Sequence, residues 1–177
     1  MNTAVKHPIE TQLISDLKLK NRHQVPRLKK IAVNVGLGDL KGNEALQKSV
    51  VEGLALITGQ KPVKTVAARA IAGFKLRQND IVGYKVTLRG QRMVDFFDRL
   101  VTYVLPRIRD FQGLSMTGFD EQSNYSLGLK DQQVFPELPY SSNASNWGLQ
   151  ITIVTTSTNK DQNVALLKSL GFPFSRS

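Results

Sequence analysis

One glycine pattern in this chain has the residue types of a nucleotide-binding turn. Gly36-x-Gly38 follows an alternating apolar stretch and precedes an expected helix. A dinucleotide fingerprint needs a third glycine, where this chain has Lys41, and an acidic residue after a second strand to hold a ribose. Because half of this motif is common in turns, an enzyme acting on nucleotides or RNA is the weaker hypothesis.

Other catalytic and metal-binding patterns are missing from the sequence. The two histidines, His7 and His23, lie in the polar N-terminal region, away from any nucleophile or paired carboxylate. There is no cysteine, so the chain has neither a disulfide nor a thiolate metal site, which fits a reducing compartment. The sequence therefore predicts no catalytic residue, no metal ligand and no cofactor.

Basic residues are concentrated in one part of the chain. Between positions 61 and 92 there are eight Lys and Arg but a single acid, Asp80. They are spread over two expected strands and a loop rather than along one helix face. This suits a folded RNA, whose phosphates lie at irregular spacing; the alternative is a solvated basic edge. The eight are Lys61, Lys64, Arg69, Lys75, Arg77, Lys85, Arg89 and Arg92.

The charge of the whole chain supports a polyanionic partner. The formal net charge is +10, and positions 16–92 hold 16 Lys and Arg against 5 Asp and Glu. Positions 110–177 hold only 4 Lys and Arg against 6 Asp and Glu, which predicts a different role for the C-terminal part. No apolar run approaches the roughly 20 residues that cross a bilayer, so no membrane partner is expected.

The segment 73–80 has the composition of an exposed, RNA-contacting loop. Gly73 permits a sharp turn, and Asn79 tolerates the left-handed backbone that a loop tip often needs. Lys75 and Arg77 can contact phosphates. Phe74 could stack on a base or belong to the core, and the sequence leaves both open.

Apolar periodicity indicates which elements position these residues. Alternation predicts strands near 31–35, 62–66, 82–88, 125–129 and 149–153, and apolar residues at helical spacing predict helices over 43–59, 93–104 and 164–170. We expect an α+β fold with a mostly antiparallel sheet, helices on one face, and the other face open to RNA. Lys85, Thr87 and Arg89 would lie on that open face. No linker divides the chain, so residues 1–177 are expected to form one domain.

Several longer stretches resemble a known family. They are Gln24-Val25-Pro26-Arg27, Asn34-Val35-Gly36-Leu37-Gly38, Thr58-Gly59-Gln60-Lys61-Pro62, Ala72-Gly73-Phe74-Lys75-Leu76-Arg77-Gln78, Lys85-Val86-Thr87-Leu88-Arg89-Gly90, Pro106-Arg107-Ile108-Arg109-Asp110-Phe111, Asn124-Tyr125-Ser126-Leu127-Gly128, Phe135-Pro136-Glu137 and Gly171-Phe172-Pro173-Phe174. In this order they resemble the large-subunit ribosomal protein five family, bacterial-type proteins that bind 5S rRNA in the central protuberance. The resemblance covers nearly the whole chain.

The resemblance implies RNA contacts at particular positions. Contacts to 5S rRNA would come from Asn34, Gln60 and Thr87, with Arg27, Lys61, Arg69 and Arg89 in support. Contacts to the elbow of peptidyl-site tRNA would come from the loop residues Gly73, Phe74, Lys75, Arg77, Gln78 and Asn79. The family usually has glycine where this chain has Asn79, so the loop tip is expected to be stiffer.

The resemblance also implies a place in the ribosome. A lobe at 24–80 would bind RNA, and a lobe at 84–177 would form an intersubunit bridge to a small-subunit head protein through Asp131, Glu137 and Tyr140. The segment 139–147 carries fewer charges than is usual for the family. The other partners would be 23S-type rRNA and neighbouring central-protuberance proteins, with the chain a monomer within a cytoplasmic ribosome or, alternatively, an organellar one. A free RNA chaperone or DNA-binding module is the remaining alternative.

Overall fold

A computed structural model of the 177-residue chain describes residues 13–19, 21–38, 44–74, 76–138 and 146–175. Its strands are β1 (Leu28–Gly36), β2 (Val63–Val66), β3 (Ile81–Leu88), β4 (Tyr125–Leu129) and β5 (Leu149–Thr155). Its longer helices are α2 (Glu44–Thr58), α3 (Gly90–Arg99) and α4 (Lys160–Ser169). The expected strands and helices are confirmed, and β1, α3 and α4 begin earlier than periodicity indicated.

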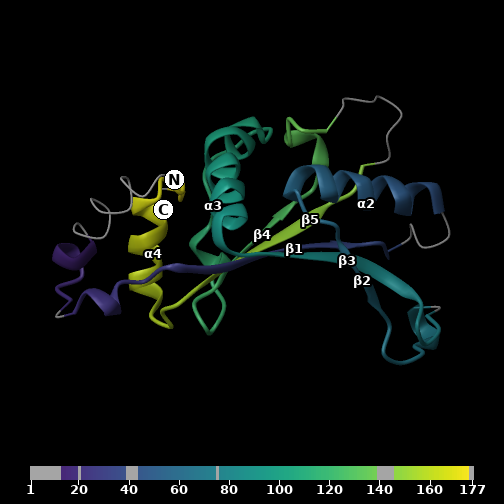
Figure 1. The fold of residues 1–177 in the computed structure, drawn as a ribbon, viewed down its shortest axis with the longest axis horizontal. Helices are drawn as coiled ribbons and strands as arrows, with labels where there is room; N and C mark the ends of the chain where they lie inside the picture. Colours follow the sequence, from purple (N-terminus) through teal and green to yellow (C-terminus); the bar gives the residue numbers. More distant parts are fainter. Residues whose placement is uncertain (1–12, 20, 39–43, 75, 139–145, 176–177) are drawn as a thin grey trace. The chain divides into compact units, whose positions relative to one another are not determined.

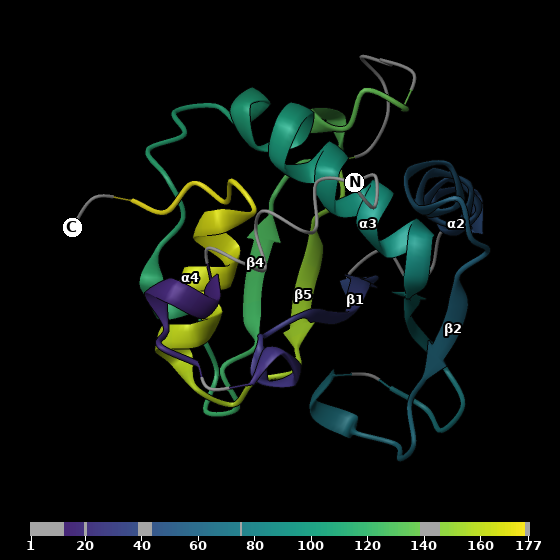
Figure 2. The ribbon, with the colours of Figure 1, turned by 60° about the vertical axis from the view of Figure 1, so that its left-hand side comes forward.

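The strands form one five-stranded sheet in the order β2-β3-β1-β5-β4. Figure 2 shows β4, β5 and β1 running side by side. The edge strand β2 pairs with β3 in antiparallel fashion, with Val63 opposite Lys85 and Thr65 opposite Gly83, and the register shifts after Thr65. The predicted α+β fold with a mostly antiparallel sheet is confirmed.

By its internal contacts the chain divides into two compact units. The first unit comprises Met1–Ile31, Arg89–Leu127 and Thr152–Ser177, and the second comprises Ala32–Leu88 and Gly128–Ile151. The functional division into lobes at 24–80 and 84–177 stays a prediction.

The second unit packs α2 against one face of its strands (Figure 1). From α2, Val50, Leu54 and Ile57 are buried, and from β3, Tyr84 and Val86 are buried. The ring of Trp147 lies against Gly53 of α2 so closely that a Cβ at Gly53 would stand 2.9 Å from its Cζ2 atom. The core of this unit therefore has room for a glycine but not for a side chain at position 53.

The first unit is built around α3, α4 and a cluster of aromatic rings. Phe172 stacks on Phe97 with ring centroids 5.9 Å apart and meets the edge of Tyr125 at 5.3 Å. The Tyr125 hydroxyl donates to the Ser115 carbonyl oxygen at 2.9 Å, and burial raises the pKa of Tyr125 to about 12. This cluster anchors the C-terminal Phe172–Phe174 stretch, because apolar rings and one satisfied hydroxyl share the same interior.

The helix expected to run up to Pro106 changes its winding on the way. The α-helical part ends at Arg99; a π-helical turn follows over Leu100–Val104, and a 3-10 turn over Leu105–Arg107 contains the proline. The Leu105 N–H donates to the Leu100 carbonyl, five residues back. In an unbroken α-helix Leu100 and Val104 would share one face and Leu105 would turn away from it; the wider turn brings Leu105 to the same side, and all three are buried.

The described residues offer neither a membrane span nor a cluster of metal ligands. No helix among them is long and apolar enough to cross a membrane. Within the same ranges, no group of three or more His, Cys, Asp or Glu residues could hold a metal ion.

Candidate nucleic-acid interface

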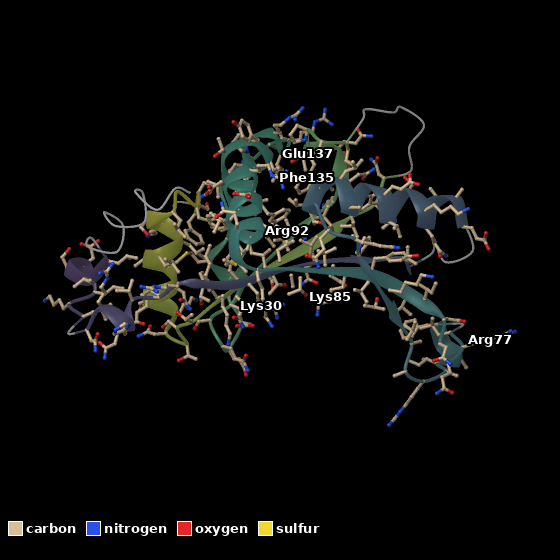
Figure 3. All side chains as sticks on the ribbon, in the orientation of Figure 1. Lys30, Arg77, Lys85, Arg92, Phe135 and Glu137 are labelled. Carbon is tan, nitrogen blue, oxygen red and sulfur yellow. The ribbon has the colours of Figure 1, made fainter. Side chains whose placement is uncertain are left out.

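The strands of the second unit have a polar face turned away from α2. Along β3, Tyr84, Val86 and Leu88 are buried, whereas Lys85 is exposed and Thr87 half-buried. Figure 3 shows the Lys85 side chain on the side of the strand away from α2. Because successive side chains of a strand point to opposite faces, Lys85 and Thr87 share one face. We call this side of the second unit's strands the open face.

On β1 the same alternation brings Asn34 to the open face. Val33 and Val35 are fully buried, and Asn34 between them is half-buried. The side chains of Asn34, Lys85 and Thr87 make no hydrogen bond or ion pair to any other described residue. The structure thus brings two of the three predicted 5S rRNA residues, Asn34 and Thr87, onto one surface with their polar groups uncommitted.

The open face also has positions without a long side chain. Its positions between the longer side chains include Ala32, Gly36 and Gly83. A Cβ at Gly83 would collide with the carbonyl oxygen of Val35 and would stand 3.1 Å from the Thr65 hydroxyl. Glycine at this buried position therefore allows the close approach of the neighbouring strands.

Gln60 and Lys61 lie at the end of α2, just before β2. The Thr58 hydroxyl donates to the Leu54 carbonyl at 2.6 Å and accepts from the Gln60 N–H at 3.3 Å. Gly59 ends the helix with φ +66°, a left-handed conformation that glycine adopts without strain. These contacts fix the backbone of Gln60, whose side chain is half-buried, while Lys61 is exposed.

The other basic residues predicted to support RNA binding lie outside the strands of the second unit. Arg27 and Arg89 are exposed residues of the first unit, and Arg69 is exposed in the loop between β2 and β3. The backbone of Arg27 is held by Thr156, whose N–H donates to the Arg27 carbonyl at 2.9 Å. Arg89 immediately precedes α3 and makes no side-chain cap to that helix.

The β2–β3 connection extends the hairpin beyond the sheet in the second unit (Figure 1). The Ala67 N–H donates to the Asp80 carbonyl, and the Asn79 N–H donates to the Ala67 carbonyl, both at 2.9 Å. Nearer the tip, Ile71 and Leu76 form a two-residue antiparallel bridge. We call residues 67–80 the hairpin loop; its described backbone closes mainly on itself.

The hairpin loop presents its side chains to solvent. Phe74 is 72% exposed, so the possibility that it belongs to the core is wrong. Gly73, Arg77 and Gln78 are exposed as well, and Figure 3 shows Arg77 projecting away from the sheet. Asn79 has φ +70°, which confirms its left-handed conformation.

One hydrogen bond shapes the base of this tip. The Asp80 carboxylate accepts from the Arg77 N–H at 2.8 Å, so the single acid in this stretch is occupied by the loop's own backbone. This arrangement leaves the Arg77 guanidinium exposed. Lys75, the other predicted phosphate contact, lies outside the described residues.

The predicted bridge segment belongs to the second unit. The Asp131 carboxylate accepts from the Gln133 N–H at 2.8 Å and caps a short 3-10 helix, Gln132–Val134. The side-chain oxygen of Gln132, itself buried, accepts from the Trp147 N–H at 2.8 Å. Glu137 is half-buried, and Tyr140 lies outside the described residues. Asp131 therefore has a structural role at the start of this segment.

Sequence reasoning missed two residues of the open face. Gln150 on β5 and Thr65 on β2 occupy the same face as Lys85 and Asn34, as burial alternation and the Thr65–Gly83 register indicate. The signal for Gln150 was present in the sequence, because the alternation Leu149, Ile151, Ile153 places it opposite the buried positions.

Comparison with known proteins gives consistent matches. Residues 21–77 match the family model "Ribosomal protein L5", and residues 81–174 match the model of the C-terminus of the same ribosomal family. The chain is 50% identical over 166 residues to "Large ribosomal subunit protein uL5" of Anaeromyxobacter sp. (strain K), covering 94% of this chain and 92% of that one. It is 48% identical over 174 residues to the protein of the same name from Geotalea daltonii, covering 98% and 97%. For Synechococcus sp. (strain RCC307) the identity is 47% over 169 residues, with 96% and 94% covered.

Proposed function

Because the chain belongs to the ribosomal protein L5 family, we propose that it binds 5S rRNA on the open face and helps to attach that RNA in the central protuberance. The chain is a structural constituent of the large ribosomal subunit and not an enzyme, and it works in a cytoplasmic ribosome of bacterial type. Its contribution is positioning, since it restrains RNA without performing chemistry.

One observation carries the proposal. The described strands of the second unit contain no Asp or Glu, and the polar side chains of Asn34, Lys85 and Thr87 have no partner among the described residues. Uncommitted amide and hydroxyl groups on an acid-free face are suited to ribose hydroxyls and base edges, and a lysine among them to phosphate.

The hairpin loop is proposed to contact the elbow of peptidyl-site tRNA. Its exposed Phe74 and Arg77 and its self-contained backbone bonds support a projecting contact that is independent of the open face. The double substitution Lys75→Ala with Arg77→Ala should weaken retention of tRNA in the peptidyl site and leave 5S rRNA affinity nearly intact. If that variant lost 5S rRNA binding, the proposed separation of roles would be wrong.

The segment around Asp131 and Glu137 is proposed to form an intersubunit bridge to a protein of the small-subunit head. Support comes from the order imposed on its start by the Asp131 cap and by the Gln132 contact to Trp147. Few charges are available there, so the bridge should depend only weakly on salt. The other proposed partners are 23S-type rRNA and neighbouring proteins of the central protuberance, with a single copy of the chain in each ribosome.

The decisive experiment compares 5S rRNA with a scrambled RNA of equal length at two salt concentrations in a gel-shift assay. We expect tighter binding to 5S rRNA at both. Equal affinity for both RNAs at moderate ionic strength would refute the proposal. Copurification with intact large subunits through a high-salt wash would argue against a free RNA chaperone or DNA-binding module.

A further inference from the structure

We propose that the outer edge of β2 binds an extended, acidic segment of a partner protein, which adds to the sheet as a further strand. β2 ends the strand order β2-β3-β1-β5-β4, so among the described strands it pairs with β3 alone (Figure 2). The backbone groups of β2 that point away from β3 are therefore not used by any described strand, and they can form the hydrogen bonds of a new ladder. The partner is a protein and the contact is a strand edge, so the proposal does not rest on RNA binding by the open face.

Exposed apolar side chains are concentrated at this edge. Among the described residues six large apolar side chains are exposed, and four of them lie at positions 63–74. Two of these four belong to β2, where Val63 is 67% exposed and Val66 is 52% exposed. A single exposed valine is ordinary, but two on one short edge strand offer apolar cross-strand contacts to an added strand. Phosphates and riboses gain little from valine, so these residues favour a peptide over RNA as the occupant.

The basic residues beside the valines determine the charge of the partner. Lys64 is exposed within β2 and Lys61 is exposed just before it, and neither makes an ion pair with another described residue. An edge lysine opposes pairing with another basic strand, which is one way in which natural sheets avoid edge-to-edge association. The chain carries a net charge of +10, so a second copy would bring like charges together at this edge. A carboxylate on the added strand would instead form a favourable cross-strand pair with Lys64.

The residues of β2 also predict a sequence for the partner strand. Directly opposite residues of an antiparallel pair contact each other, so each residue of β2 selects one residue of the added strand. Apolar β-branched residues suit the positions opposite Val63 and Val66. A threonine suits the position opposite Thr65, and a glutamate suits the position opposite Lys64. Taken in antiparallel order, from Val66 back to Val63, these choices give Ile-Thr-Glu-Val.

A labelled peptide with Ile-Thr-Glu-Val at its centre and aspartates on both sides tests the docking on the full-length chain. Its fluorescence anisotropy should rise on titration with the protein, and the β2 amides that face away from β3 should exchange more slowly with deuterium. Lys64→Glu should weaken binding about 10-fold, because an opposite-charge pair becomes a like-charge pair. Lys48→Glu is the matched control, since Lys48 is exposed on α2 of the same unit and the change in net charge is the same. This control should bind the peptide nearly as well as the unaltered protein.

Two modified peptides separate strand addition from simple attraction between charges. Replacing the central glutamate of the peptide by lysine should weaken its binding to the unaltered protein and restore binding to the Lys64→Glu variant, because the cross-strand pair is then opposite in charge again. Methylating the peptide nitrogens that face β2 removes the ladder donors and keeps every charge, so it should abolish binding. If the methylated peptide bound as well as its parent, the contact would be electrostatic adsorption only and the proposal would be overturned.

Failure of the parent peptide to bind overturns the proposal, and two further measurements then identify the occupant. Dimerisation of the free chain in sedimentation experiments, reversed by Val63→Asp, would assign the edge to a second copy of the chain. A loss of 5S rRNA affinity in Lys64→Glu would assign the edge to RNA. Because 5S rRNA affinity is measured without the peptide, the proposed function stands or falls independently of this result.

Discussion

Replacing Gly53 by alanine should destabilise the second unit, although alanine is the better helix former. Gly53 lies in the middle of α2, where a Gly→Ala change in an exposed helix would add about 1 kcal/mol of stability. Here the new Cβ would stand 2.9 Å from Cζ2 of Trp147 and 3.5 Å from a methyl of Leu138. The close contact with Trp147 should therefore oppose the stabilisation that the higher helix propensity of alanine would give.

The sizes of the packing cost and of the gain in helix propensity decide whether Gly53→Ala lowers or raises the stability. Carbon atoms pack best at about 3.5–4.0 Å, so the Trp147 ring must retreat by at least about 0.6 Å. The ring is rigid and 5% exposed, and its backbone N–H is held by Gln132 at 2.8 Å. Overpacking of a core costs about 1–3 kcal/mol, which exceeds the helical gain and leaves a net loss of about 1 kcal/mol.

Urea unfolding followed by circular dichroism measures this loss. Fluorescence is unsuitable because Trp147 is the only tryptophan and is itself varied. In a Trp147→Phe background, which removes the obstructing atom, Gly53→Ala should become neutral or stabilising, giving a coupling energy of about 1–2 kcal/mol. Gly73→Ala is the control, since a Cβ there meets nothing within 4 Å. If Gly53→Ala stabilised the unaltered protein by about 1 kcal/mol, the packing argument would be refuted.

Three further predictions concern the RNA contacts and the first unit. Thr87→Val should weaken 5S rRNA binding while leaving its salt slope unchanged, whereas Lys61→Ala should reduce that slope by about 1, because only the lysine releases counterions. Arg77→Ala should lower tRNA retention in assembled ribosomes without changing the thermal stability of the free chain, since its side chain is exposed. The stability that neutral Tyr125 contributes should be fully present below pH about 10. It should fall as the pH rises towards 12, by up to about 1.4 kcal/mol per pH unit, because unfolded tyrosine ionises there while the raised pKa keeps Tyr125 neutral in the folded protein.

Each of these has a result that contradicts it. A changed salt slope in Thr87→Val, measured by titration at four salt concentrations, would mean that the substitution disturbs charged contacts. A lower melting temperature in Arg77→Ala would assign the guanidinium a structural role. Tyr125→Phe should flatten the alkaline stability loss, and an unchanged loss in that variant would assign it to other groups.

The parts of the fold that follow from local pattern were predictable. The alternation of Ile31, Val33 and Val35 predicted a strand, and these three residues are buried in it because one side of the sheet is covered by helices. The left-handed conformation of Asn79 was also predictable, since its short polar side chain tolerates positive φ.

Features that depend on distant contacts were not predictable. Gln132 lies in a polar stretch, and nothing local indicates that it is buried beneath Trp147 and accepts its N–H. The π-helical turn over Leu100–Val104 adjusts three apolar residues to the core, which periodicity read along one helix cannot anticipate. The composition of the segment did not determine whether Phe74 is buried or exposed, and in the fold it is exposed.

The way in which the hairpin loop closes has a consequence for how this protein can change. Ala67 and Asp80 are held side by side by backbone hydrogen bonds, so the strands that carry them do not rely on what lies between. Evolution or an engineer can lengthen, trim or exchange the intervening residues while the frame beneath keeps its shape. The proposed tRNA contact of the hairpin loop and the proposed 5S rRNA binding of the open face can therefore change independently in a single chain.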